Sequence, residues 1–159
     1  MSKLTQYGHA FQIKALAILI TDRDFLQQIA DIVSPDYFDN DAGKWIMRKT
    51  LKYFNEYKSV PTMEVFKVEV EGINQELQSV AVKDLLKQAY KASKALDLDY
   101  VKDTFLDFCK NQTLKSALMK SVDLLELGDY DDIRNLIDRA LKAGTERDIG
   151  HEYMTELED

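Results

Sequence analysis

Few side chains in this sequence could carry out covalent or metal chemistry, and they are widely separated. The two histidines, His9 and His151, lie at opposite ends of the chain, and Cys109 is the only cysteine. A structural zinc site takes four cysteine or histidine ligands, so this set completes none. Cys109 stands near Phe105 and Phe108, a setting more typical of a core residue than of a nucleophile. We therefore expect no metal site and no catalytic residue, and the single cysteine favours a reducing compartment.

A loop that binds nucleotide phosphates is also missing from the sequence. The P-loop pattern G-x-x-x-x-G-K-[ST] needs two glycines at a fixed spacing, followed by Lys and then Ser or Thr. Gly144 and Gly150 do not have that spacing, and no such pair follows them. The sequence therefore predicts that the chain has no P-loop site for ATP and magnesium and is not an enzyme.

Clusters of carboxylates and of aromatic residues have simpler structural explanations. Aspartates gather where helices are expected to begin, at Asp22 and Asp24 and at Asp129, Asp131 and Asp132. Negative charge stabilises a helix N-terminus, so these positions need no catalytic role. Aromatic residues on or near one expected helix resemble a base-stacking platform: Trp45, Tyr53, Phe54 and Tyr57. At helical spacing such a stripe is more often part of a core.

Length and composition favour one domain, or one domain with an appendage. The chain has 159 residues, 45% of them hydrophobic, with only two prolines and six glycines. So little turn material favours few long elements over many short strands. The longest apolar run, Ala15–Ile20, is far shorter than the roughly 20 residues of a membrane span, and no signal-peptide features accompany it. We expect a soluble, cytoplasmic protein without membrane contact.

Charge is divided unevenly along the chain, which bears on the kind of partner. Residues 1–95 hold 13 Lys and Arg against 12 Asp and Glu, a net charge of +1. Residues 96–159 hold 8 against 16, a net charge of −8. Nucleic-acid affinity comes mainly from Lys and Arg that neutralise phosphates. The acidic second half is therefore expected to be a solvated surface or to meet protein rather than DNA.

The spacing of apolar residues predicts helices nearly throughout, and hence an all-α fold. We expect residues 1–95 to form a compact head of five or six helices. These helices are expected over Ala10–Ile20, from Thr21 or Asp22 to Ser34-Pro35, from the Asn40-Asp41 cap, from Thr62 through Glu76, and from Ser79 to about Ala92. The first of them is apolar at most positions and should be buried on most sides.

Residues 96–143 predict a long antiparallel helical hairpin, followed by a linker over residues 144–159. The expected elements are an Asp97 cap, a helix over Leu98–Leu127, a left-handed cap at Gly128, and a second helix from Asp129 to Gly144. The long helix is apolar over more than one stripe, and one antiparallel partner covers a single stripe. Two explanations stay open: another chain or domain covers the surplus apolar surface, or residues 1–95 cover it within one monomer.

Five short motifs follow one another within residues 11–76. They are Phe11-Gln12-Ile13-Lys14, Phe25-Leu26, Pro35-Asp36-Tyr37-Phe38, Tyr53-Phe54-Asn55-Glu56-Tyr57 and Val60-Pro61-Thr62. In this order and spacing they resemble the N-terminal domain of DnaB-type replicative DNA helicases, particularly the phage branch. Residues 97–143 resemble the helical hairpin that follows this head in the family. Residues 144–159 resemble the linker that leads to the ATPase motor.

The resemblance implies a non-catalytic scaffold. In this family the N-terminal domains pair through their hairpins into a collar above a hexameric motor ring, where primase and loaders dock. It implies self-association, primase and a helicase loader as partners, weak or no DNA binding, and ATP and magnesium confined to a motor absent from this chain. The residues expected at the oligomer interface are Phe105, Phe108, Leu114, Leu118, Val122, Ile133 and Ile137. The linker residues are Asp148, Ile149, Gly150, His151 and Tyr153, which we expect to lack order without a motor to receive them.

Two other functions stay open on the sequence. A free-standing helicase accessory, such as a loader, an inhibitor or a decoy collar, would share the fold and act in trans. A small helical DNA-binding protein would instead use a basic patch. The candidates for that patch are Lys14, Lys44, Arg48, Lys49, Lys52 and Lys58. The net charge of only +1 in residues 1–95 argues against this function.

Overall fold

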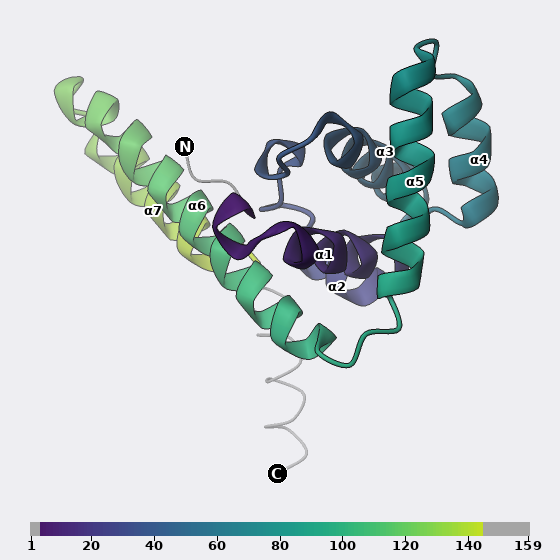
Figure 1. Cartoon of the computed structure of the whole chain (residues 1–159). Helices are drawn as coiled ribbons and strands as arrows, with labels where there is room; N and C mark the ends of the chain where they lie inside the picture. The colour runs from purple at the N-terminus through teal and green to yellow at the C-terminus, as the bar shows by residue number, and fades with distance from the viewer. Residues whose placement is uncertain (1–3, 145–159) are drawn as a thin grey trace. The chain divides into compact units, whose positions relative to one another are not determined.

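The computed structural model describes residues 4–144, which form seven α-helices and two short 3-10 helices with no β-strand among them (Figure 1). The all-α prediction is therefore confirmed for the described residues. The elements are η1 Leu4–Tyr7, α1 His9–Thr21, α2 Arg23–Ile29, η2 Pro35–Tyr37, α3 Asp41–Tyr57, α4 Met63–Glu71, α5 Glu76–Ala92, α6 Leu98–Glu126 and α7 Tyr130–Lys142. Within this part of the chain, no helix is both long and apolar enough to cross a membrane.

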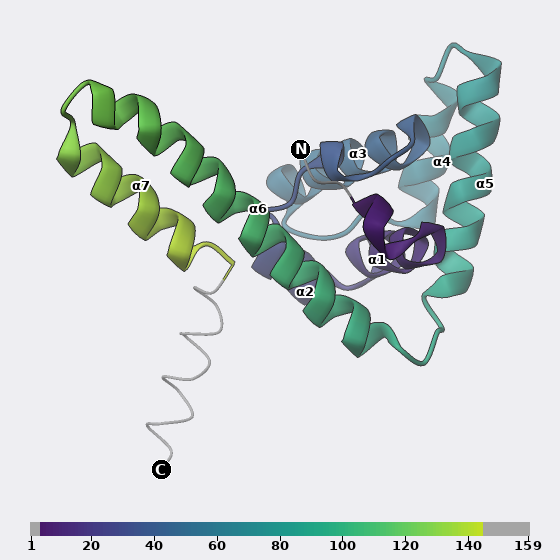
Figure 2. The same cartoon turned by 60° about the vertical axis from the view of Figure 1, so that its left-hand side comes forward.

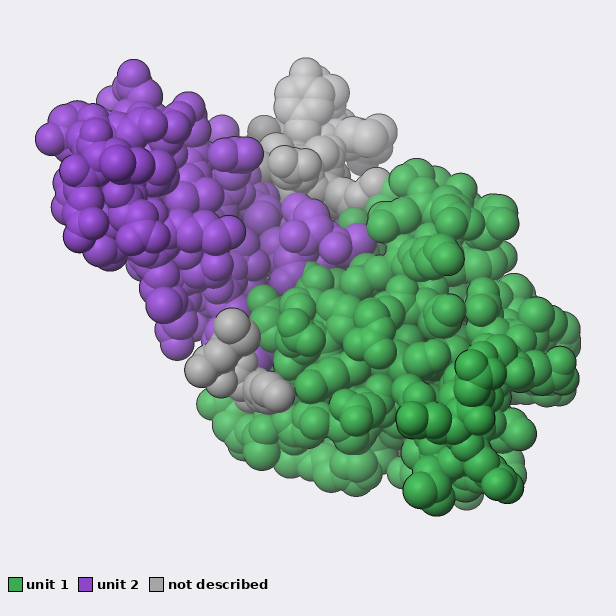
Figure 3. Space-filling view, turned by 90° about the horizontal axis from the view of Figure 1, so that it is seen from above, with its two compact units in different colours: residues 1–27, 33–103 green, residues 28–32, 104–159 purple. Residues whose placement is uncertain are grey.

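The chain divides into two compact units, which Figure 3 colours separately. Unit 1 comprises residues 1–27 and 33–103, and unit 2 comprises residues 28–32 and 104–159. The boundary falls inside α6, whereas the sequence placed the end of the head at residue 95. Two ion pairs explain why the start of α6 belongs to unit 1. Lys102 Nζ lies 2.7 Å from Asp22 Oδ2, and Lys14 Nζ lies 2.7 Å from Asp97 Oδ2.

The core of unit 1 is organised around α1. All six residues from Ala15 to Ile20 are at most 2% exposed. Consecutive residues point to all sides of a helix, so burial of six in a row requires neighbours on several sides. The helix packs against α3 and α5, which lie beside it in Figure 1. The prediction that the first helix is buried on most sides is confirmed.

Side-chain caps begin three of the helices in unit 1 at the predicted places. The side-chain oxygens of Asp22, Asn40 and Thr62 accept hydrogen bonds from the backbone N–H three residues further on, at 3.0, 2.7 and 3.3 Å. Each cap satisfies an N–H group that has no partner within its own helix. These short-range interactions fix where α2, α3 and α4 begin.

The predicted break between the fourth and fifth helices was misplaced. We expected the fourth helix to extend through Glu76 and the fifth helix to begin at Ser79. In the structure, α4 ends at Glu71 and α5 begins at Glu76. Gly72 directly follows α4, and glycine in a helix interior costs about 1 kcal/mol relative to alanine. The apolar pattern alone did not reveal this stop, because it continues across the glycine.

In unit 2 the chain turns back at Gly128, which has the predicted left-handed conformation with a φ of 72°. Helix α7 then runs back along α6 in the opposite direction (Figures 1 and 2). Beyond α7, Gly144 is also left-handed, with a φ of 77°. Gln28 Nε2 donates a hydrogen bond to the Gly144 carbonyl at 3.3 Å, and Ile32 packs directly over Gly144. These contacts explain why residues 28–32 belong to unit 2.

We expect Gly144→Ala to destabilise the protein. A left-handed conformation costs a non-glycine residue roughly 1–2 kcal/mol. A Cβ at this position would also lie only 2.6 Å from Ile32 Cδ1. Urea unfolding should show the loss, and combining the change with Ile32→Val should restore only the part that comes from the steric clash. An unfolding free energy equal to that of the parent chain would contradict the tight fit.

The Asp22 carboxylate should make the stability of unit 1 depend on pH in the acid range. Partial burial acts to raise its pKa, but hydrogen bonds from Lys102 and from the Phe25 N–H outweigh this effect and hold the pKa below the ordinary value of 3.8. The stabilisation is therefore complete above pH 3.8 and is lost as the pH falls through the lower folded-state value.

Asp22→Asn is the variant that tests this dependence, because asparagine keeps the cap and removes the charge. At pH 7 the variant should be less stable than the parent by no more than about 1 kcal/mol, since the ion pair is partly exposed. Urea unfolding at a series of pH values should show this difference closing as the carboxylate of the parent chain protonates. A difference that stays constant down to pH 2 would contradict the assignment.

Candidate protein-interaction surface

Four large apolar side chains gather on the exposed side of the second half of α6. Leu118, Met119, Val122 and Leu125 are 53%, 68%, 57% and 58% exposed. Positions three, four and seven residues apart lie on one side of a helix, so these side chains form a continuous stripe over about two turns. We call these four residues the α6 stripe. Scattered apolar residues are normal on a protein surface, whereas a contiguous group marks a surface that binds a partner.

The buried side chains of unit 2 range from small to large, because Phe105 and Phe108 of α6 are covered as well. Ala117 on α6 and Ala140 on α7 are buried. Both alanines are covered, whereas the larger apolar residues of the α6 stripe are left exposed. Further apolar residues are exposed near the turn and on α7, namely Leu127, Tyr130 and Leu141. Unit 2 therefore exposes more apolar surface than a closed pair of helices requires.

The structure separates the seven predicted interface residues into three groups. Leu118 and Val122 are exposed and belong to the α6 stripe. Leu114, Ile133 and Ile137 are half-buried. Phe105 and Phe108 are 0% and 4% exposed. Phe105 and Phe108 are therefore removed from the interface candidates. A side chain with almost no exposed surface in the folded chain cannot contact a second copy.

Sequence reasoning left two residues of the stripe out of the interface set. Leu125 lies seven residues after Leu118 and shares its helical face, so its spacing was a sufficient signal. Met119 carries no such signal, because it neighbours Leu118 and is followed by Lys120. Its exposure of 68% follows from which side of α6 is covered, and that is a tertiary property.

The pKa values of two reactive side chains, Cys109 and Asp132, are raised. Cys109 is fully buried, and burial raises the pKa of its thiol, so the thiol is protonated at neutral pH and has no access to solvent. The pKa of Asp132 is raised by its hydrogen bond and its repulsion with Asp129 at the start of α7. In residues 4–144, no three His, Cys, Asp or Glu side chains are close enough to hold a metal ion.

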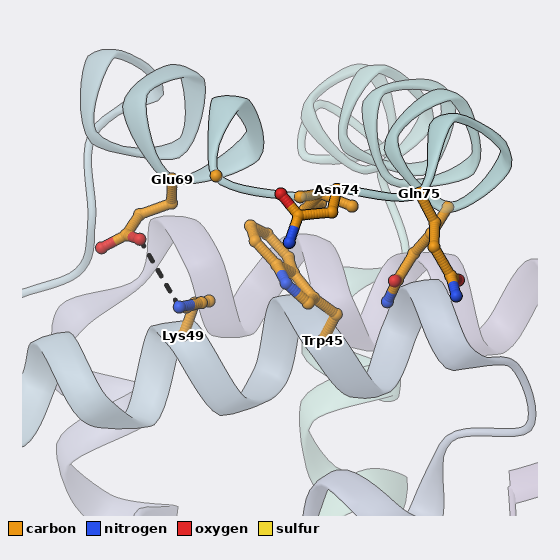
Figure 4. Close-up of a pocket in the computed structure, with 8 residues that line it drawn as sticks. Trp45, Lys49, Glu69, Asn74 and Gln75 are labelled. Carbon is orange, nitrogen blue, oxygen red and sulfur yellow. Dashed lines mark ion pairs between the residues drawn. The ribbon is translucent and has the colours of Figure 1, made fainter.

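A polar pocket of about 400 Å³ lies in unit 1 where the loop after α4 faces α3 (Figure 4). Lys49 Nζ is 3.5 Å from Glu69 Oε2 and 5.6 Å from the centre of the Trp45 ring. Asn74 and Gln75 project from the loop toward these residues. Because Lys49 is already paired with a carboxylate, the pocket holds no free cation for a phosphate.

The six residues proposed as a DNA-binding patch are partly engaged in other contacts. Lys14 is paired with Asp97 and Lys49 with Glu69. Lys58 ends α3 in a left-handed conformation, with its Nζ 5.8 Å from the centre of the Phe54 ring. Paired lysines neutralise fewer phosphates, and this weakens the electrostatic case for DNA binding by unit 1.

Two of the four aromatic residues on α3 are not available to stack on bases. Trp45 and Phe54 are buried, as expected of core residues. Tyr57 is 63% exposed and packs against Tyr53, with their ring centres 4.6 Å apart. The core interpretation therefore holds for Trp45 and Phe54, whereas Tyr57 lies on the surface.

The predicted linker residues Asp148, Ile149, Gly150, His151 and Tyr153 lie outside the residues that the structure describes. The functional interpretation therefore depends on residues 4–144. Comparisons of the chain with protein-family models, with curated proteins and with solved structures each found no match.

Proposed function

We propose that this chain is a non-catalytic assembly and docking domain of a DnaB-type hexameric replicative DNA helicase. The α6 stripe is the observation that carries this proposal. Self-association through paired helices needs large apolar side chains that a folded monomer leaves exposed. Leu118, Met119, Val122 and Leu125 have this property, and they lie on the long helix that resembles the family's hairpin.

Burial of the stripe in a second copy is energetically reasonable. Covering one large aliphatic side chain completely contributes about 1.5–3 kcal/mol relative to leaving it exposed. Each of the four side chains is already partly covered, so its contribution is smaller, but a symmetric pair counts every one of them twice. The sum is large enough to offset part of the cost of association, which is at least 4 kcal/mol on most estimates.

The charge distribution supports a protein partner over DNA. Residues 96–159 carry a net charge of −8, which repels a phosphate backbone. In this proposal ATP and magnesium belong to a separate motor domain, and primase and a loader bind elsewhere on the collar. The domain itself supplies ring symmetry and a docking platform in DNA replication, and it acts in the host cytoplasm if a phage encodes it.

The mass of the chain in solution as a function of concentration tests the assembly step. Sedimentation equilibrium should show the 18.3 kDa chain associating to a multiple of that mass. Isothermal titration with ATP and magnesium should show no binding above background. A monomer at all concentrations up to about 1 mM, where the binding free energy is near −4 kcal/mol, would contradict the proposal.

The length of the native polypeptide distinguishes the proposal from its closest alternative. Mass spectrometry of the protein that carries this N-terminus in its own cell or phage lysate is the decisive measurement. A product two to three times as long as 159 residues supports a helicase collar followed by its motor. A product of 159 residues supports instead a free-standing accessory that acts on a helicase in trans.

A further inference from the structure

A groove of about 740 Å³ runs between α4 and α5 in unit 1, two helices that lie side by side in Figures 1 and 2. Its floor is apolar and well packed, since Phe66, Val70 and Leu86 are 1%, 2% and 8% exposed. Met63 and Val80 stand at its rim and are about half exposed. The accessible apolar surface of the groove therefore comes mainly from Met63 and Val80, above a floor that is already packed.

Charged residues border the groove with an excess of lysine. Lys67, Lys83 and Lys87 line it together with Glu71 and Asp84, a net charge of +1 on a chain whose total is −7. None of the three lysines forms an ion pair with another residue of the part that the structure describes. Asp84 is engaged locally, because its Oδ2 accepts a hydrogen bond from Gln88 at 2.7 Å. The groove thus combines an apolar floor with unpaired cations.

A hydrogen-bonding group of the groove is also unsatisfied. The Tyr90 hydroxyl, from the groove-facing side of α5, is buried and has no hydrogen-bond partner among the described residues. Burial raises the pKa of this phenol, so it keeps its proton at neutral pH and can donate to an acceptor. A buried polar group without a partner is rare. Because this hydroxyl is covered in the folded chain, recognition of a partner depends on the exposed residues of the groove.

We propose that the groove between α4 and α5 binds an amphipathic helix of a partner protein, with the apolar side of that helix on Met63 and Val80 and its Asp or Glu side chains facing Lys67, Lys83 and Lys87. Two neighbouring helices form a natural seat for a third helix, whose apolar residues recur every three or four positions. The apolar floor and the two carboxylates of the groove make a nucleic acid a poor occupant. The site is separate from the α6 stripe and does not depend on the helicase assignment.

Two synthetic peptides test the proposal with the full chain. Each has 18 residues, with leucines spaced to form one helical stripe, and the flanking positions are glutamate in one peptide and lysine in the other. Fluorescence anisotropy should show the glutamate peptide binding at least tenfold more tightly than the lysine peptide. The double variant K83E/K87E should remove most of this preference. Amide chemical shifts that the glutamate peptide changes should map to α4 and α5.

Two further variants separate this site from general attraction between charges. K115E/K120E makes the same change in charge at two exposed lysines of α6, and it should leave binding of the glutamate peptide within about twofold of the parent. Val80→Ala should weaken the binding severalfold while circular dichroism stays unchanged, because Val80 is an exposed apolar residue of the groove. Equal binding of the two peptides, equal losses in both double variants, or displacement of the peptide by a single-stranded oligonucleotide would overturn the proposal.

Discussion

Replacing Leu118 and Val122 together by glutamate should abolish self-association of the chain while leaving its helices intact. Both side chains are more than half exposed, so the folded monomer gains no buried charge. The helix propensity of glutamate is within a few tenths of a kcal/mol of those of leucine and valine, so the substitutions do not disrupt α6. In an assembled pair, however, each new carboxylate would be removed from water without a partner.

The expected size of this effect follows from the apolar area that would no longer be buried. Two half-exposed large side chains contribute roughly 1.5–3 kcal/mol per copy, and a symmetric pair counts them twice, which corresponds to at least about a hundredfold weaker association. Sedimentation equilibrium measures the dissociation constant, and far-ultraviolet circular dichroism confirms the helix content. The double variant should show the monomer mass of about 18.3 kDa at concentrations where the parent chain is associated.

Leu77→Glu is the matched control for this experiment. Leu77 is 88% exposed in the first turn of α5, so the substitution changes the same residue type outside the α6 stripe. Glutamate in a first turn also suits the helix dipole. If Leu77→Glu lowers the mass as much as the double variant does, the stripe has no special role. If neither variant changes the mass, the contact lies on another surface, and Leu141→Glu on α7 is the next variant to examine.

Phe105→Ala should destabilise the protein by about 3–5 kcal/mol, the range found when a buried aromatic residue is truncated to alanine. Phe105 is 0% exposed, so the change removes a complete set of packing contacts and leaves a cavity. Urea unfolding followed by circular dichroism gives the free energy. Because most domains have only 5–15 kcal/mol of stability, this variant should be close to unfolding at 37 °C.

Leu118→Ala is the comparison that distinguishes the core from the interface. It shortens an apolar side chain on the same helix at a position that is 53% exposed. Measured at concentrations where the chain is monomeric, its unfolding free energy should stay within about 0.5 kcal/mol of the parent. Similar losses for the two variants would show that α6 has no distinct buried and exposed sides, and the division of the interface candidates would then be wrong.

Local interactions explain why the helices could be predicted so closely from the sequence. The caps at Asn40 and Thr62 act over three residues, and the left-handed turn at Gly128 depends on the residue itself. The apolar density of Ala15–Ile20 likewise predicted burial without reference to any partner. Such features are present wherever the segment folds, so the sequence by itself determined the all-α class and most helix limits. The end of the second helix was predicted wrongly, because α2 ends at Ile29 and not at Ser34-Pro35.

The tertiary structure alone decided which apolar residues are buried and which are left on the surface. Periodicity predicts that Phe105 and Leu118 lie on apolar faces of α6, but it does not say that the first is in the core and the second is exposed. That outcome depends on contacts between residues far apart in sequence, which the spacing of apolar residues within α6 does not reveal. The groove beside Tyr90 has the same origin, since it exists only when α4 and α5 pack together. Burial depends on how two or more elements pack together. The periodicity of apolar residues within one segment therefore identified the helices but not the candidate binding surfaces.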